Sequence, residues 1–231
     1  MLTLLIFQIP PLDWTALAWF FLCWVGYGWY TESTAHGTRG LVGVSHVHRL
    51  EWARQMLRRE VRMVDSSLVG NLMSSVSFYA NTTIYIVAAL MALWGTLDTA
   101  IRVTAELPFA RETGRTLWEI KLLLLIGVFV FAYFKFTWSL RQFNLLSILI
   151  GAAPGTEVEA AEAERCAQKL ALVNTLAGNE FNRGIRAYYF GLAALAWFVQ
   201  PWLFLVVTAV VVTVLYRRDY ASATLTALRN D

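Results

Sequence analysis

Four long apolar runs constrain this chain more than any other feature. A membrane-crossing helix needs roughly 20 mainly apolar residues, or about 17 when flanking side chains reach the interface. The first two runs contain no charged residue, and the last is long for one crossing and short for two. They occupy residues 14–30, 68–97, 122–134 and 187–216. We therefore expect an all-α, polytopic membrane protein in which residues 1–231 form a single transmembrane domain with cytoplasmic helical extensions.

The last apolar run is interrupted by Gln200-Pro201, and this dipeptide decides how often the chain crosses the membrane. Proline disfavours helix continuation because it lacks a backbone N–H, and Trp197 and Trp202 on either side suit a membrane interface. A tight turn here gives five spans, whereas one unbroken final helix gives four. We predict five, at about residues 12–30, 68–97, 117–138, 184–199 and 202–217.

Charges between the runs predict the orientation. Lys and Arg concentrate in the cytoplasmic loops of membrane proteins, and six arginines lie between the first two runs, whereas no charged side chain precedes Leu12. The N-terminus is therefore expected outside, and the turn at Gln200-Pro201 returns Arg217 and Arg218 to the cytoplasm. The six residues are Arg39, Arg49, Arg54, Arg58, Arg59 and Arg62.

A cytoplasmic helix is expected before the fourth span. Thr156 and Glu159 have the spacing of a capping box, in which two side chains satisfy the first backbone N–H groups of a helix. A helix from Glu157 would extend through the cytoplasm toward the membrane, with a break near Gly178 or Gly184.

The second span carries a polar face. Ser74, Ser77, Asn81 and Tyr85 recur at helical spacing. Polar groups in hydrocarbon need partners or water. One interpretation is a pore or polar-solute pathway, which a homo-oligomer would arrange around its axis. The other is close helix packing with hydrogen bonds across the interface.

Basic side chains near the inner ends of the spans form a second candidate site. Grouped arginines bind phosphate groups, and basic clusters beside a span attract anionic lipid headgroups. The alternative is that these residues only set the orientation, with Arg62 and Asp65 paired within one helical turn. The candidates are Arg62, Lys135, Arg141, Arg183 and Arg186.

The sequence gives little support for catalysis, metal binding or a cofactor. His46 and His48, with His36 nearby, lie two residues apart, so a helix would point them to different faces. Ser and Cys residues lack a His and carboxylate constellation, and the glycines of residues 37–43 lack the lysine of a phosphate-binding loop. We therefore expect no catalytic residue, metal, cofactor or nucleic-acid partner, and an enzyme is the least favoured class.

Seven short motifs follow one another in a specific order along nearly the whole chain. They are RMVD at 62–65, GNL at 70–72, SFYANTT at 77–83, LWEIK at 117–121, FKFTWSLRQFN at 134–144, SILIG at 147–151 and FNRGIRA at 181–187. This series resembles the DUF599 family. The resemblance implies a polytopic membrane protein of bacteria, with plant relatives, and hence the bacterial inner membrane. It implies no biochemical role.

Two hypotheses of function follow. The first is an oligomeric channel or transporter for an ion or small polar solute, lined by the second span. The second is an accessory or structural subunit that binds anionic lipid or a larger complex, without transport or catalysis. Its motivation is the lack of a deeply placed charge pair in the sequence pattern, since many transporters carry one.

Overall fold

The computed structural model describes residues 10–33, 37–106 and 114–229, and every regular element among them is an α-helix. The expected all-α class is therefore confirmed. The helices are α2 (Pro11–Glu32), α4 (Leu41–Leu57), α5 (Met63–Gly95), α6 (Leu97–Ala105), α7 (Arg115–Gly151), α8 (Ala160–Val199), α9 (Pro201–Tyr220) and α10 (Ala223–Arg229).

Helix starts follow local chemistry in two cases and depart from the sequence prediction in a third. Pro11 and Pro201 lie in the first turns of α2 and α9, where a missing N–H costs no hydrogen bond. α8 begins only at Ala160, and its N-cap Glu159 makes no side-chain capping bond. The predicted capping box is wrong, because Thr156 lies four residues before the first helical residue.

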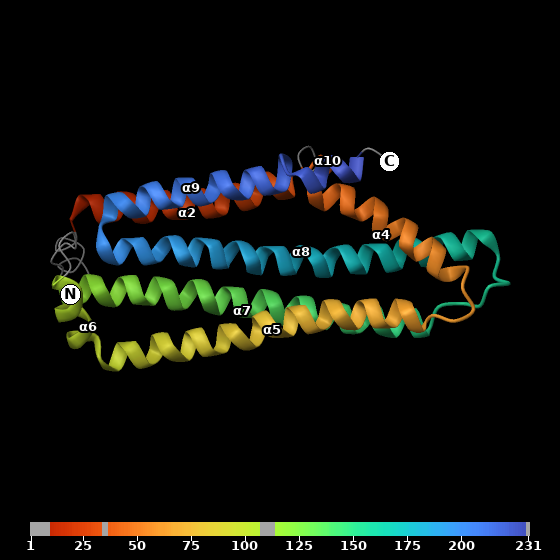
Figure 1. Ribbon diagram of the computed structural model, residues 1–231, viewed down its shortest axis with the longest axis horizontal. Coiled ribbons are helices and arrows are strands. Elements are labelled where there is room, and N and C mark those ends of the chain that lie inside the picture. Colours follow the sequence, from red (N-terminus) through yellow and green to blue (C-terminus); the bar gives the residue numbers. More distant parts are fainter. Residues whose placement is uncertain (1–9, 34–36, 107–113, 230–231) are drawn as a thin grey trace.

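Five long helices lie side by side along the length of the molecule (Figure 1). α7 and α8 run antiparallel at the centre, α5 packs on α7, and α9 packs on α8 with α2 beside it. The chain reverses at Gln200, between the end of α8 and the start of α9. The predicted turn at Gln200-Pro201 is thus present.

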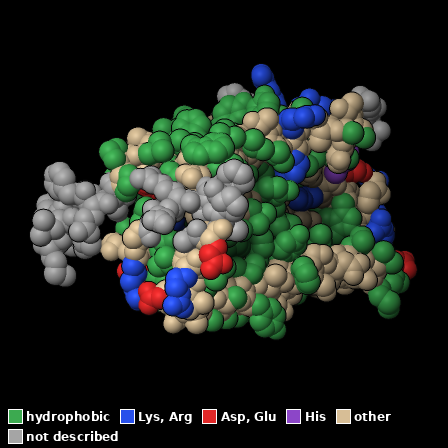
Figure 2. All heavy atoms as spheres, turned by 60° about the vertical axis from the view of Figure 1, so that its left-hand side comes forward, with side chains coloured by type: hydrophobic (Ala, Val, Ile, Leu, Met, Phe, Trp, Pro, Cys, Tyr) green, Lys and Arg blue, Asp and Glu red, His purple; other side chains and the backbone are tan. Residues whose placement is uncertain are grey.

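Among the described residues, three segments are long and apolar enough to cross a membrane: α5, α7 and Pro201–Arg229. Figure 2 shows hydrophobic side chains over the middle of the face in view, with charged side chains gathered toward the ends. α7 and α8 have 37 and 40 residues. At 1.5 Å per residue they are about 55 and 60 Å long, whereas a hydrocarbon core is about 30 Å thick. Either helix would extend well beyond a membrane that it crosses.

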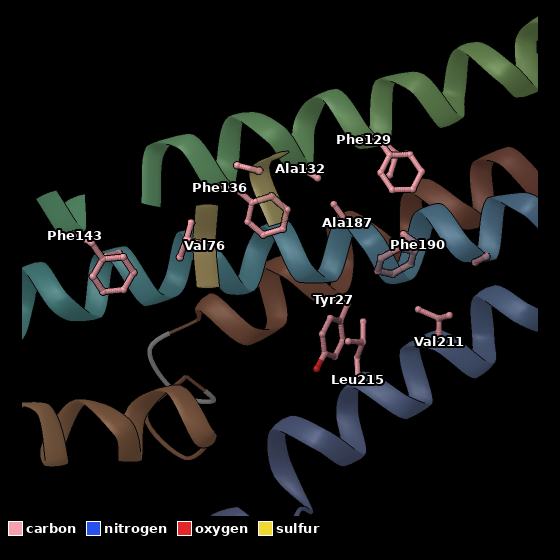
Figure 3. Packing of buried hydrophobic residues seen from close by; sticks show 14 of the residues in the cluster. Tyr27, Val76, Phe129, Ala132, Phe136, Phe143, Ala187, Phe190, Val211 and Leu215 are labelled. Atoms are coloured by element: carbon pink, nitrogen blue, oxygen red, sulfur yellow. The ribbon is translucent and has the colours of Figure 1, made fainter. Parts of the chain in front are cut away.

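Aromatic rings fill the core between the helices (Figure 3). The Phe20 ring of α2 lies 5.6 Å from that of Phe190 on α8 and 5.2 Å from that of Phe204 on α9, measured between centroids. On the other side of α8, Phe136 of α7 packs against Gly184, where a Cβ would collide with its ring. Gly184 and Gly178 therefore do not break α8, which is continuous, but allow close approach.

α4 packs against the N-terminal half of α8, which extends beyond the C-terminal end of α2 (Figure 1). The Arg54 guanidinium donates to both carboxylate oxygens of Glu164 on α8, at 2.7 and 2.9 Å. Nearer the start of α4, a ring nitrogen of His46 lies 2.8 Å from the Thr175 hydroxyl. α4 is thus held to α8 by polar contacts at both ends.

The pairing expected between Arg62 and Asp65 is not the one observed. Asp65 is buried and accepts hydrogen bonds from Arg59, at 2.7 Å, and from the Trp52 indole, at 2.9 Å. Arg62 instead donates to the backbone carbonyls of Ala153 and Pro154 in the connection between α7 and α8. The α4–α5 connection brings Arg59 closer to Asp65 than the helical spacing alone suggests.

Candidate functional site

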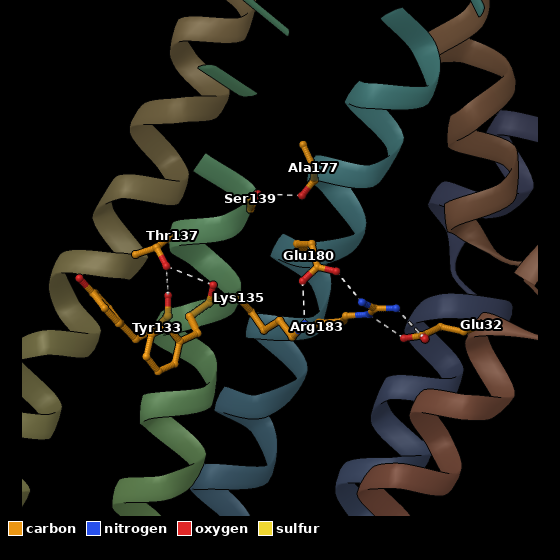
Figure 4. A network of polar contacts seen from close by, with 9 residues as sticks. Glu32, Tyr133, Lys135, Thr137, Ser139, Ala177, Glu180 and Arg183 are labelled. Atoms are coloured by element: carbon orange, nitrogen blue, oxygen red, sulfur yellow. Dashed lines mark hydrogen bonds and ion pairs between the residues drawn. The ribbon is translucent and has the colours of Figure 1, made fainter. Parts of the chain in front are cut away.

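An ion-pair network joins α7, α8 and α2 (Figure 4). The Lys135 ammonium on α7 lies 2.9 Å from Glu180 on α8. Arg183, one turn after Glu180, donates to it at 2.5 Å and to both carboxylate oxygens of Glu32 on α2, at 2.7 and 2.8 Å. The four side chains therefore form an alternating row of charges across three helices.

A second polar group adjoins this network on the side of α9. Arg186 on α8 is buried and donates to the Thr31 hydroxyl, while its Nε atom has no hydrogen-bond partner within the described part of the chain. Asp219 on α9 accepts from the Tyr27 hydroxyl at 2.8 Å and from Arg218 at 3.1 Å. These contacts hold α2, α8 and α9 together at one level.

A groove of about 590 Å³ runs along α2 and ends at these charges. Its walls come from α2, α7 and α8, and its lining is mainly apolar. Aromatic and aliphatic side chains form most of its length, and four charged side chains form one end. The apolar part is Phe21, Trp24, Val25, Trp29 and Phe131, and the charged part is Glu32, Lys135, Arg183 and Arg186.

Cations outnumber carboxylates among the charged side chains that line the groove, with Lys135, Arg183 and Arg186 against Glu32. Behind this lining, Glu180 pairs with Lys135 and Arg183, and the negative charge of Asp219 acts on Arg186. Glu180 is the more enclosed of the two carboxylates that contact Arg183, with its side chain 10% exposed, whereas that of Glu32 is 44% exposed. A ligand anion would therefore compete with Glu32 for Arg183 more easily than with Glu180.

A separate buried group lies near the start of α2 and the end of α8. The Lys121 ammonium of α7 lies 5.6 Å from the centroid of the Trp197 ring, and the Trp197 indole donates to Asp13 of α2 at 2.8 Å. All three side chains are almost completely buried. Trp197 therefore links α2 and α7 through α8, and this group has no open cavity beside it among those described.

A family model described as "Protein of unknown function, DUF599" matches residues 15–224, which is most of the chain. The chain belongs to the DUF599 family. Comparison with curated proteins and with solved structures gives no match. Membership of DUF599 supports the resemblance drawn from the motifs, and the site must be interpreted from its own geometry.

The polar-face residues of α5 lie on the outside of the bundle. Ser74, Asn81 and Tyr85 are exposed and Ser77 is half-buried. None of these four side chains makes a hydrogen bond to another residue in the described ranges. Within one chain they therefore line no internal pathway, and any partner for them must come from outside it.

The predicted basic group is divided by the structure. Lys135, Arg183 and Arg186 meet at the charged end of the groove. Arg62 lies at the connection between α7 and α8, bonded to backbone carbonyls, and Arg141 is exposed, with its guanidinium 5.9 Å from the Trp138 ring. Only three of the five candidates therefore share one site.

Glu180 and Glu32 were missed by sequence reasoning, although they complete the network. The spacing of Glu180 and Arg183 is one that places two side chains on the same helical face, and this signal was available. No such signal identified Lys135 as the partner of Glu180, because that contact depends on the register between α7 and α8. The sequence pattern also did not reveal the Lys135–Glu180 pair, which forms between α7 and α8.

The histidines point to different partners. His46 contacts Thr175, and His48 lies 3.4 Å from the Leu228 carbonyl on α10, while His36 falls outside the described residues. No group of three potential His, Cys, Asp or Glu ligands occurs in the part of the chain that is described. The histidines there serve helix packing.

Proposed function

We propose that this DUF599 protein binds an anionic amphiphile, such as an anionic lipid, in the groove along α2. The observation that carries the proposal is the combination of an aromatic wall and a cationic end in a single groove. An acyl chain would lie against Trp24 and Phe131, and the headgroup would reach Lys135, Arg183 and Arg186. The volume of the groove falls within the roughly 300–1,000 Å³ of ordinary ligand sites.

Exposure along α2 favours a ligand that comes from the bilayer. Trp29 is 76% exposed and Val25 and Leu22 are exposed to a similar extent. Side chains of this kind on a long apolar helix suit contact with lipid, since hydrocarbon is their favourable solvent. A water-soluble anion would gain nothing from the apolar length of the groove.

The proposed topology has five spans, formed by α2, α5, α7, α8 and α9, with the N-terminus outside and the C-terminus in the cytoplasm of a bacterial cell. The reversal at Gln200 supports it, because α9 then runs back beside α8. The arginine-rich α4 region lies beyond the charged end of the groove. That end would therefore face the inner leaflet, where anionic headgroups concentrate.

The test is retention of anionic lipid by purified protein, measured by native mass spectrometry after release from nanodiscs containing equal amounts of phosphatidylglycerol and phosphatidylcholine. Glu32→Gln should increase retention of phosphatidylglycerol, because it removes the carboxylate that competes for Arg183. Arg183→Gln should weaken retention roughly tenfold, as expected for loss of one charge-assisted contact.

Glu162→Gln is the matched control, because Glu162 is exposed on α8 and lies away from the groove. Equal retention of phosphatidylglycerol by all variants would contradict the proposal. The gain expected for Glu32→Gln is informative because partial unfolding would lower retention, not raise it.

A second candidate function, an oligomeric channel or transporter, is favoured by one observation. Ser74 and Asn81 are exposed on a helix that is apolar enough to cross a membrane, and polar groups in hydrocarbon need partners or water. Copies of the chain assembled through α5 would place these residues around a common axis.

Cysteine substitution tests this candidate. Hydrophilic thiol reagents should modify Asn81→Cys in membranes if that residue lines water, and should not modify the control Val210→Cys, which replaces an exposed apolar residue in the middle of α9. Purified wild-type protein should also pass an ion or small solute across liposomes at a rate above that of empty controls. Protection of Asn81→Cys together with absent flux would leave α5 with a packing role only.

A further inference from the structure

Arg49 of α4 occupies an unusual position against α8. Its guanidinium lies against Gly178, so closely that a Cβ on that glycine would be 2.6 Å from Nη2. Long side chains on a helix extend toward its N-terminus. The Arg49 side chain therefore points toward the start of α4, where its guanidinium meets Gly178 of α8. A glycine at this point of α8 is what allows the charge to enter the interface.

The Arg49 charge has no counter-charge in the described ranges. Arg49 forms no salt bridge with those residues, and its Nη1 atom is buried without a hydrogen-bond partner among them. Burial lowers the pKa of Arg49, and no carboxylate acts in the opposite direction. Arginine nevertheless keeps its charge in proteins, and a charge that is largely shielded from water without a partner is costly. The arrangement therefore favours a bound anion.

A cavity of about 300 Å³ adjoins this guanidinium, between α4, α5, α7 and α8. None of the residues that line it is acidic. Asn174 and Asn182 lie four residues before and after Gly178, so the two amides flank the guanidinium on one face of α8. Neither amide makes a hydrogen bond to another described side chain or backbone group. Ser75 of α5 adds a hydroxyl on the opposite wall.

We infer that this cavity binds a phosphate-class oxyanion, either free phosphate or the phosphate of a lipid headgroup, between Arg49 and the two asparagines. A guanidinium presents paired N–H donors that match two oxygens of one phosphate. Each asparagine amide contributes two further donors. The site shares no lining residue with the groove along α2, so it stands independently of the amphiphile proposal.

The first test is a phosphate titration of full-length protein in phosphatidylcholine nanodiscs, at constant ionic strength maintained with chloride, followed by thermal unfolding. Phosphate should raise the unfolding temperature with saturation. Arg49→Gln should weaken the apparent affinity tenfold or more, by about one charge-assisted contact. Arg165→Gln is the matched control, because Arg165 is an exposed arginine on α8.

A second measurement needs no variant. Phenylglyoxal modifies arginines, and mass spectrometry locates the modified residues. Phosphate should protect Arg49 in the wild-type protein and leave Arg165 equally reactive. This result remains decisive even if Arg49→Gln fails to fold.

Lipid as the source of the oxyanion is tested in nanodiscs that contain phosphatidic acid. Retention of phosphatidic acid by the wild type and Arg165→Gln, with loss from Arg49→Gln, would support the site and identify a lipid headgroup as its ligand. An effect of inorganic phosphate alone would support the site and identify the free ion as its ligand. The inference is overturned if Arg49→Gln and Arg165→Gln respond alike to both and Arg49 is not protected.

Discussion

α5 and α8 lie on either side of α7 and use their polar residues in opposite ways. α5 turns Ser74 and Asn81 away from the bundle, whereas α8 turns Asn174 and Glu180 into it. α5 is one of the three segments that satisfy length and hydropathy for a span, and α8 is not. Burial in this protein therefore follows position in the bundle more closely than the hydropathy of a helix.

The difference has a simple cause. α8 contacts α7, α9 and α4, so most of its circumference is covered by protein, and its charges can find partners. α5 packs mainly on α7 and leaves a wide outer face. A helix surrounded by protein tolerates polar groups that are paired, whereas a peripheral helix in a membrane must be apolar or must gain a partner from elsewhere.

The largest expected effect comes from breaking the α8 network. Glu180→Gln leaves Lys135 without its carboxylate and weakens the support of Arg183. Removing one member of a buried ion pair costs about 3 kcal/mol or more, so the free energy of unfolding in mixed detergent micelles should fall by about that amount. The exposed α8 carboxylate gives the control: Glu162→Gln should change stability by less than about 0.5 kcal/mol. Equal effects would mean that burial between the helices does not strengthen the network.

The next effect tests close packing between α7 and α8. Gly184→Ala introduces a methyl group into the space of the Phe136 ring, and overpacking costs about 1–3 kcal/mol. Gly127→Ala is the control, because a Cβ there meets nothing within 4 Å and alanine is the better helix former by about 0.5–1 kcal/mol. We expect Gly184→Ala to lower the thermal unfolding temperature and Gly127→Ala to maintain or raise it. Adding Phe136→Leu to Gly184→Ala should restore the unfolding temperature that Gly184→Ala lowers.

A smaller effect compares the two faces of α5. The buried Thr83 hydroxyl lies 2.7 Å from that of Tyr188 on α8, so Thr83→Val should cost about 0.6–1 kcal/mol of unfolding free energy. Asn81 lies on the outer face, so Asn81→Leu should change the free energy of unfolding by less than about 0.5 kcal/mol. If copies associate through α5, light scattering should show a changed oligomeric state for Asn81→Leu alone. A larger stability loss for Asn81→Leu than for Thr83→Val would reverse the assignment of the faces.

The smallest effect concerns the exposed contact between α4 and α8. The hydrogen bond from Arg54 lowers the pKa of the Glu164 carboxyl from its ordinary value. Because the folded-state pKa is the lower one, the contact stabilises the protein above the ordinary pKa of a glutamate and is lost as pH falls through the lower folded-state pKa. The protection factors of the α4 amides against hydrogen exchange, which correct for the slower intrinsic exchange in acid, should therefore fall on acidification, and Arg54→Gln should remove that part of the pH dependence. High salt should weaken the effect, as for other surface pairs.

Several elements were predictable because their signals are local. The apolar runs located the long helices, and Gln200-Pro201 marked the reversal between α8 and α9. The periodicity of Ser74, Ser77 and Asn81 correctly placed them on one face. The helix ends were less predictable, because hydropathy marks where a membrane ends, whereas backbone hydrogen bonding continues, as in α7 and α8, far beyond that point.

The sequence by itself determined the helical class, the positions of the apolar runs and the family to which the chain belongs. Tertiary structure alone decided that the α5 polar face points outward, that Lys135 and Glu180 form a buried pair, and that Arg49 reaches Gly178. Each of these depends on the register and rotation of one helix against another. Periodicity fixes which residues share a face of a helix, but only packing between helices decides what that face meets.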